Sequence, residues 1–235
     1  MILFIIDDRL EYERIYFQTI GADMNYIVID LEYNQNFDFR AGQKAPSNPL
    51  LPLEIIQIGA VKLDGGRNIV DRFGTTVRPS VYRGLNPFVA KVTGLTGDVL
   101  RNSPSFAQAY RGLVRFIGKD DAVLCFWGSD DMKELLRNAL FFKERCKALP
   151  LQYINVQSLT SVHLDLPSKQ QLGLGTVVDL LEIESELPFH NAPNDAFYTA
   201  QIFAHIYDEE KINLIDFDLA QFMGQIAKIK AEVKP

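Results

Sequence analysis

The chain has 235 residues, 47% of them apolar, and a formal net charge of -6. This length is enough for one well-packed domain. The negative net charge excludes nucleic-acid binding through bulk positive charge, although a metal site could supply positive charge locally. Cys125 and Cys146 lack metal-ligand spacing, so reduced, buried thiols are expected. The opening apolar run lacks a basic leader and a cleavage site. The protein is therefore predicted to be soluble and cytoplasmic, with no signal peptide and no membrane contact.

The first half of the chain predicts an antiparallel three-stranded meander. A strand over 26–34 is followed by a polar, proline-containing loop over 35–52, of a length that is often functional. Two β-rich runs over 54–64 and 68–79 are separated by Gly65-Gly66-Arg67, a strong hairpin signal. A further strand-like run at the N-terminus ends in Asp7 and Asp8, which we interpret as surface acids.

The second half alternates helices with strands, which predicts parallel pairing. A helix capped by Ser103 is followed by a buried strand over 122–127 and by a helix capped by Ser129. A short strand from Tyr153 comes next, and then two more helices, around 175–183 and 192–207. The tail over 214–233 has apolar residues at helical spacing and predicts an amphipathic helix that docks on its own domain, with docking on a partner as the alternative.

Asp30 and Glu32 are the most informative pair of residues. They are separated by one residue near the end of the first predicted strand, so both carboxylates project from the same face. Their mutual repulsion favours a divalent cation between them. The alternative is a strand end that frays into solvent with two hydrated acids.

Two later segments carry further candidates. Asp130 and Asp131 lie where a strand ends and a helix begins, a common ligand position in open α/β sheets, although acids also favour the first turn of any helix. His190 lies in a loop five positions before Asp195, which opens a helix. A histidine there can transfer protons near neutral pH. His163 and His205 lack such neighbours and are interpreted as structural.

Taken in order, these motifs resemble the DEDDh family of 3′-to-5′ exonucleases. The resemblance covers about 25–207 and rests on Asp30-Leu31-Glu32, EIIQIGAV, VTGLT, WGSDD and HNAPNDA. It is nearest to the KapD-like and ERI-1-like branch, because WGxxD replaces the HNAxFD of polymerase proofreading subunits. The resemblance implies an α/β, ribonuclease H-like fold with a central mixed sheet flanked by helices. It divides the chain into an extension (1–24), an exonuclease domain (25–208) and a helical tail packed on the domain (209–235).

The resemblance also implies residue roles. Two divalent ions, Mg²⁺ or Mn²⁺, would be held by Asp30, Glu32, Asp131 and Asp195, with His190 as general base. Leu31, through its backbone, and Thr93, Gly94 and Leu95 would contact the terminal nucleotide. Phe88 and Tyr33 could stack on bases, although simple packing is the alternative for both, and Tyr33 stands where many relatives have a small residue or threonine.

The implied function is release of nucleoside 5′-monophosphates from the 3′ end of single-stranded RNA or DNA. The expected partner is therefore a single-stranded nucleic-acid end. Two alternatives stay open. The chain could be a non-catalytic nucleic-acid or protein-binding module, or a hydrolase that uses the same metals on a small substrate.

Overall fold

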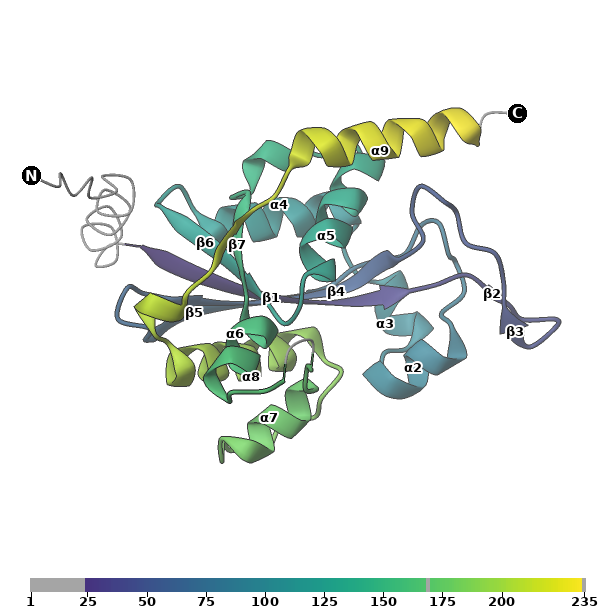
Figure 1. Cartoon of the computed structure of the whole chain (residues 1–235). Helices are drawn as coiled ribbons and strands as arrows, with labels where there is room; N and C mark the ends of the chain where they lie inside the picture. Colours follow the sequence, from purple (N-terminus) through teal and green to yellow (C-terminus); the bar gives the residue numbers. More distant parts are fainter. Residues whose placement is uncertain (1–23, 168–169, 234–235) are drawn as a thin grey trace, which may run out of the picture.

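The centre of the molecule is a six-stranded sheet of order β5-β4-β1-β6-β7-β8 with helices on both faces (Figure 1). The computed structural model describes residues 24–167 and 170–233, so Asp7 and Asp8 lie outside the described residues. β4 and β5 run antiparallel to their neighbours, whereas β6 and β7 continue parallel to β1. The predicted meander and the predicted parallel half are both confirmed. The strands are β1 (Asn25–Asn34), β4 (Glu54–Leu63), β5 (Ile69–Thr76), β6 (Ala122–Phe126), β7 (Gln152–Asn155) and β8 (Leu214–Asp216).

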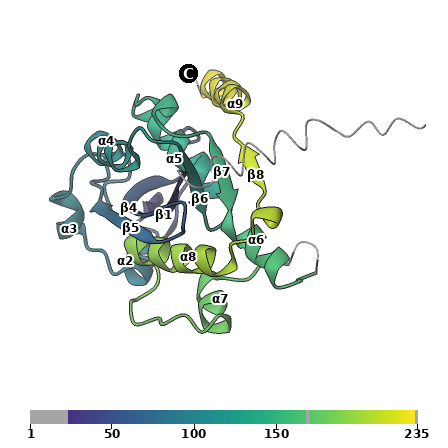
Figure 2. The same ribbon diagram turned by 90° about the vertical axis from the view of Figure 1, so that its left-hand side faces the viewer.

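Two helical layers cover the sheet, and Figure 2 shows them on opposite sides. One layer contains α4 (Phe106–Ile117), α5 (Asp130–Phe141) and α9 (Leu219–Glu232), and the other contains α6 (Val156–His163), α7 (Leu174–Leu180) and α8 (Ala192–Ile206). Side chains alternate along β1, so Ile27, Ile29 and Leu31 pack in the first layer while Tyr26 and Val28 pack in the second.

Smaller elements gather near the carboxyl end of β1. There, α2 (Pro87–Thr93) contacts β1 and is followed by α3 (Gly97–Arg101). The predicted loop over 35–52 contains a short hairpin of β2 (Phe37–Asp38) and β3 (Gln43–Lys44). Two 3-10 turns complete the described elements, η1 (Cys146–Ala148) and η2 (Glu209–Lys211).

Several boundaries differ from the sequence expectation. The cap of α4 is Ser105, whose capping box with Gln108 satisfies the first turn, so the predicted cap at Ser103 is wrong. Instead, the Ser103 hydroxyl donates to the Val99 carbonyl, 2.8 Å away. Ser129 does precede α5, but its side chain makes no capping hydrogen bond.

The tail also differs in part. Residues 214–216 form the edge strand β8, antiparallel to β7, and the helix begins only at Leu219. A three-residue strand is too short to give an alternating pattern distinct from helical spacing. Leu219 and Phe222 are buried in the core beside α5, so the beginning of α9 packs on its own domain.

Candidate active site: a cluster of carboxylates

Asp30 and Glu32 project from the face of β1 that α8 covers, at the end of the strand next to α2. Burial raises the pKa of Asp30 well above its ordinary value, and the negative charges of Asp131, Asp195 and Glu32 raise it further. Burial also raises the pKa of Glu32 to about 7, with added repulsion from Asp195 and Asp131. β1 stays paired with β4 beyond Glu32, as far as Asn34, so the strand end is not frayed and that alternative is wrong.

The first turn of α8 brings Asp195 to this face. Ligand atoms of Glu32, His190 and Asp195 all lie within 4.8 Å of one another. The Asp195 Oδ2 accepts a hydrogen bond from the His190 backbone N–H at 3.0 Å, and His190 takes a left-handed backbone conformation (φ 59°). Burial raises the pKa of Asp195 to about 6 although that hydrogen bond acts against the rise. Among the described residues, nothing donates a hydrogen bond to its buried Oδ1.

Gly59 and Gln57 of β4 hold the beginning of α8 against the sheet. Gly59 pairs with Asp30, and a Cβ added to it would lie 2.1 Å from the backbone carbonyl atoms of Ala192. Only glycine allows so close an approach. The Gln57 side chain accepts a hydrogen bond from the Ala192 N–H at 3.0 Å. Both residues belong to the EIIQIGAV motif, but their role was not predicted from the sequence, although a glycine and a glutamine inside an apolar strand are a usable signal.

Asp131 approaches from the other layer, at the beginning of α5. Its Oδ1 accepts a 2.6 Å hydrogen bond from the Tyr33 hydroxyl. A β-bulge between Glu32 and Tyr33 breaks the strand register where Tyr33 enters this layer. Burial raises the pKa of Asp131 to about 6, the Tyr33 hydrogen bond acts against this, and Asp130 and Glu134 add to the rise. Asp130 itself is exposed.

The segment expected to contact a terminal nucleotide forms the end of α2 and the turn that leads to α3. Gly94 ends α2 in a left-handed conformation (φ 69°), and Thr93 Oγ1 accepts a hydrogen bond from the Leu95 N–H at 3.1 Å. The Leu31 side chain is buried in the core, so only its backbone can face a ligand. Phe88 is 71% exposed, so the packing alternative is wrong for this side chain.

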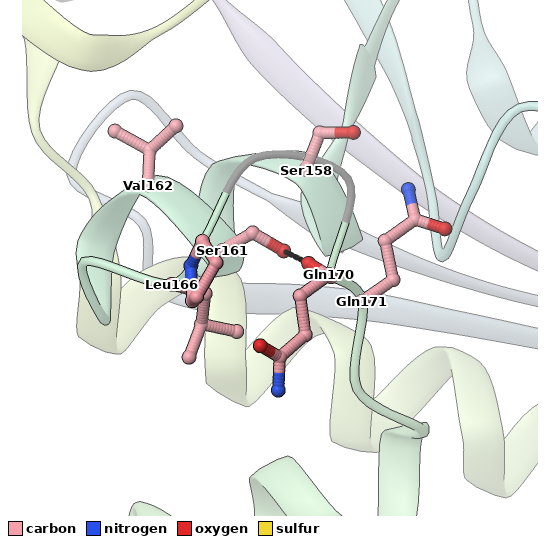
Figure 3. A pocket seen from close by; sticks show the side chains of 7 residues that line it. Ser158, Ser161, Val162, Leu166, Gln170 and Gln171 are labelled. Atoms are coloured by element: carbon pink, nitrogen blue, oxygen red, sulfur yellow. Dashed lines mark hydrogen bonds between the residues drawn. The ribbon is translucent and has the colours of Figure 1, made fainter.

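A separate hollow of about 240 Å³ lies beside α6 (Figure 3). Its wall includes Ser161, whose hydroxyl donates to the Gln170 carbonyl at 3.1 Å. None of the described residues that line it is ionisable. These residues therefore offer none of the acid, base or metal-ligand chemistry of the carboxylate cluster.

Comparison with known proteins identifies the family of this chain. The family model RNase_T, described as exonuclease, matches residues 27–203, which is more than half of the chain. The chain belongs to this exonuclease family. The family predicted from the motifs is thereby confirmed.

Two curated relatives of this chain are bacterial DNA polymerase III proteins. The chain is 32% identical over 164 residues to the PolC-type DNA polymerase III of Thermotoga maritima, a match that covers 67% of this chain and 11% of that protein. It is 32% identical over 121 residues to the DNA polymerase III subunit epsilon of Treponema pallidum, covering 52% of this chain and 50% of that protein. The chain therefore spans half or less of the length of these relatives.

Several solved structures share the fold. The nuclease domain of 3′hExo, a DEDDh family member bound to rAMP, has a TM-score of 0.69 at 21% identity over 82% of this chain and 96% of that chain. The E. coli ExoI–ssDNA complex has a TM-score of 0.61 at 14% identity, and the match covers 77% of this chain and 40% of that chain. The Mg²⁺- and Mn²⁺-bound form of S. pombe Pop2p has a TM-score of 0.58 at 16% identity, and the match covers 87% of this chain and 94% of that chain. The predicted ribonuclease H-like fold is confirmed.

In the described part of the chain, no helix has both the length and the apolar character to cross a membrane.

The Tyr33 hydroxyl provides a specific prediction. Tyr33→Phe removes the one hydrogen-bond donor seen on Asp131, so the metal affinity of the cluster is expected to fall by about 10- to 100-fold, as for other groups that orient a ligand. The dependence of the hydrolysis rate on Mg²⁺ concentration should shift accordingly, with a smaller change at saturating Mg²⁺. Tyr110→Phe is a matched control, because its hydroxyl donates to the Arg145 carbonyl at 3.0 Å. An unchanged Mg²⁺ dependence in Tyr33→Phe would show that Asp131 does not need this donor.

Proposed function

We propose that this chain is a divalent-metal-dependent 3′-to-5′ exonuclease that releases nucleoside 5′-monophosphates from single-stranded RNA or DNA. The observation that carries the proposal is the convergence of Asp30, Glu32, Asp131 and Asp195 from β1, α5 and α8, all with raised pKa values. Four carboxylates that repel one another, one buried and three half-buried, destabilise a fold unless something positive compensates them, so such a cluster marks a functional site.

The residues fit a pair of hard divalent cations. Asp195 Oδ1 is buried and has no hydrogen-bond partner among the described residues, as expected for an oxygen whose partner is an ion. Carboxylate oxygens are the ligands that Mg²⁺ and Mn²⁺ prefer, and four of them balance the charge of two such ions. We infer that Asp30, Glu32, Asp131 and Asp195 are the ligands.

The chemistry is hydrolysis of the last phosphodiester bond. Bound divalent cations would neutralise the scissile phosphate, lower the pKa of the attacking water and stabilise the departing 3′ oxygen. His190 accepts the proton of the attacking water as its oxygen bonds to phosphorus, and the bond from phosphorus to the 3′ oxygen of the preceding nucleotide breaks. Thr93, Gly94, Leu95 and the Leu31 backbone hold the terminal nucleotide in line for this attack.

The role of His190 can be tested directly. His190→Ala is expected to slow turnover by about 10²- to 10⁴-fold, the usual contribution of a positioned general base, and to leave metal binding largely intact. Normal turnover in His190→Ala would assign this histidine a structural role.

The proposed function is tested with single-stranded RNA and DNA oligonucleotides that carry a label at the 5′ or the 3′ end, with Mg²⁺, Mn²⁺ or EDTA. The 3′ label should appear at once as a mononucleotide, the 5′ label should give a descending ladder, and EDTA should stop both. Binding without cleavage under every metal condition would favour the non-catalytic module. Hydrolysis of small phosphate esters alone would favour the small-substrate hydrolase.

A further inference from the structure

We propose that a pocket lined by Arg78, Arg83 and Arg101, called here the arginine pocket, binds a backbone phosphate of the substrate strand outside the carboxylate cluster. This inference rests on the proposed function, because it extends the path of the nucleic acid away from the cleaved bond. The pocket has a volume of about 380 Å³. Its remaining wall is formed by Pro79, Ser80, Leu85, Gly97 and Leu100.

The charge of the arginine pocket is opposite to that of the whole chain. The chain has a net charge of -6, yet the described residues that line this pocket include three arginines and no acid. Arg101 pairs with the exposed Asp98, whereas no described carboxylate lies within ion-pair distance of Arg78 or Arg83. Guanidinium groups match the geometry of phosphate oxygens and remain charged at any physiological pH.

The wall that carries Arg78 and Arg83 is held in place by buried hydrogen bonds. The buried Glu54 carboxylate accepts hydrogen bonds from the backbone N–H groups of Ser80, Val81 and Tyr82 at 2.6–3.2 Å. The Arg78 N–H donates to the Pro104 carbonyl at 2.8 Å. A rigid wall keeps the two arginine backbones fixed before a ligand arrives, which lowers the entropic cost of binding.

The same wall is tied to the carboxylate cluster. The Asn34 side chain, two residues after Glu32 on β1, donates to the carbonyls of Tyr82 and Gly84 at 3.0 and 2.9 Å. Leu85 and Leu100 of the pocket also pack in the small apolar cluster that includes Leu95. The arginine pocket is therefore built on the segments that lead to both the metal-ligand strand and the expected nucleotide-contact residues, where the backbone of a bound strand would continue.

The test compares substrate length and salt dependence. Because each phosphate contact on a single strand contributes about 0.7 to the slope of log affinity against log salt, Arg78→Gln/Arg83→Gln should lower the magnitude of this slope by up to about 1.4. For an oligonucleotide of about ten nucleotides, kcat/KM at low salt should fall by about tenfold. Hydrolysis of a dinucleotide should be unchanged, because its scissile phosphate lies at the carboxylate cluster.

A matched control is Arg115→Gln. Arg115 is exposed in the last turn of α4. It therefore lies at the other end of this helix from Pro104, whose carbonyl accepts the hydrogen bond from the Arg78 N–H. This control should keep the wild-type slope of log affinity against log salt. Anisotropy of the labelled strand in EDTA reports the same slopes without hydrolysis, so loss of the proposed function and loss of the pocket are separate outcomes. If the double variant matches Arg115→Gln in both slope and length dependence, the arginine pocket does not bind the strand.

Discussion

Asp30→Asn is expected to abolish hydrolysis and at the same time stabilise the metal-free fold. Removing one anionic ligand from the cluster should lower the rate by at least about 10²-fold, more than is typical for groups that only support a ligand. Burial and three neighbouring carboxylates raise the pKa of Asp30, so its charge opposes folding when no cation is present. Thermal or urea unfolding in EDTA at neutral pH should therefore show a higher free energy of unfolding for Asp30→Asn than for the wild type.

The pH dependence of this stability has a defined sign. A carboxyl whose pKa is higher in the folded state keeps its proton longer there, so the free energy of unfolding falls as pH rises through that window. The pKa values of Asp131 and Asp195 are raised to about 6, and that of Glu32 to about 7. In EDTA, the free energy of unfolding should therefore fall between about pH 4 and about pH 7. Mg²⁺ should reverse it by binding the ionised form. Equal stability of Asp30→Asn and wild type across this range, with activity retained, would contradict both parts of the prediction.

The second large effect separates two adjacent acids. Asp131→Asn should abolish exonuclease activity because Asp131 lies beside Tyr33 and raises the pKa of both Asp30 and Glu32. Asp130→Asn should leave activity nearly unchanged, because Asp130 is exposed and a helix turns about 100° per residue. Its cost to stability should be at most about 0.5 kcal/mol, from the lost interaction with the helix dipole.

Both variants are measured as purified proteins on one labelled oligonucleotide, with unfolding curves in parallel. Since they differ by one position and carry the same substitution, each is the control for the other. An inactive Asp130→Asn beside an active Asp131→Asn would place the ligand one residue earlier in α5.

The sheet could be predicted in large part because its signals are local. The apolar run that begins 26–34, the Gly65-Gly66-Arg67 turn and the apolar run at 122–127 each depend on neighbours in sequence. α2, α3 and α6 were not predicted, because helices of seven, five and eight residues carry little periodicity. β8 was missed because its pairing with β7 joins residues about sixty positions apart.

The acidic residues of the candidate site were visible in the sequence, but their supports were not. Paired acids at strand and helix ends signal ligands through residue type and spacing alone. The contacts of Tyr33 with Asp131 and of Gln57 with Ala192 span 98 and 135 positions, so only the folded chain brings them together. The β-bulge at Tyr33 depends on the pairing of β1 with β4, which single-strand patterns do not report.

The most direct test of the two-metal assignment is a crystal of the protein soaked with Mn²⁺ and a nucleoside 5′-monophosphate, measured at the manganese absorption edge. We expect two anomalous peaks about 3.5–4 Å apart, ligated by Asp30, Glu32, Asp131 and Asp195, with the phosphate between the ions and His190. A soaked crystal with bound nucleotide and no manganese among these four carboxylates would contradict the assignment.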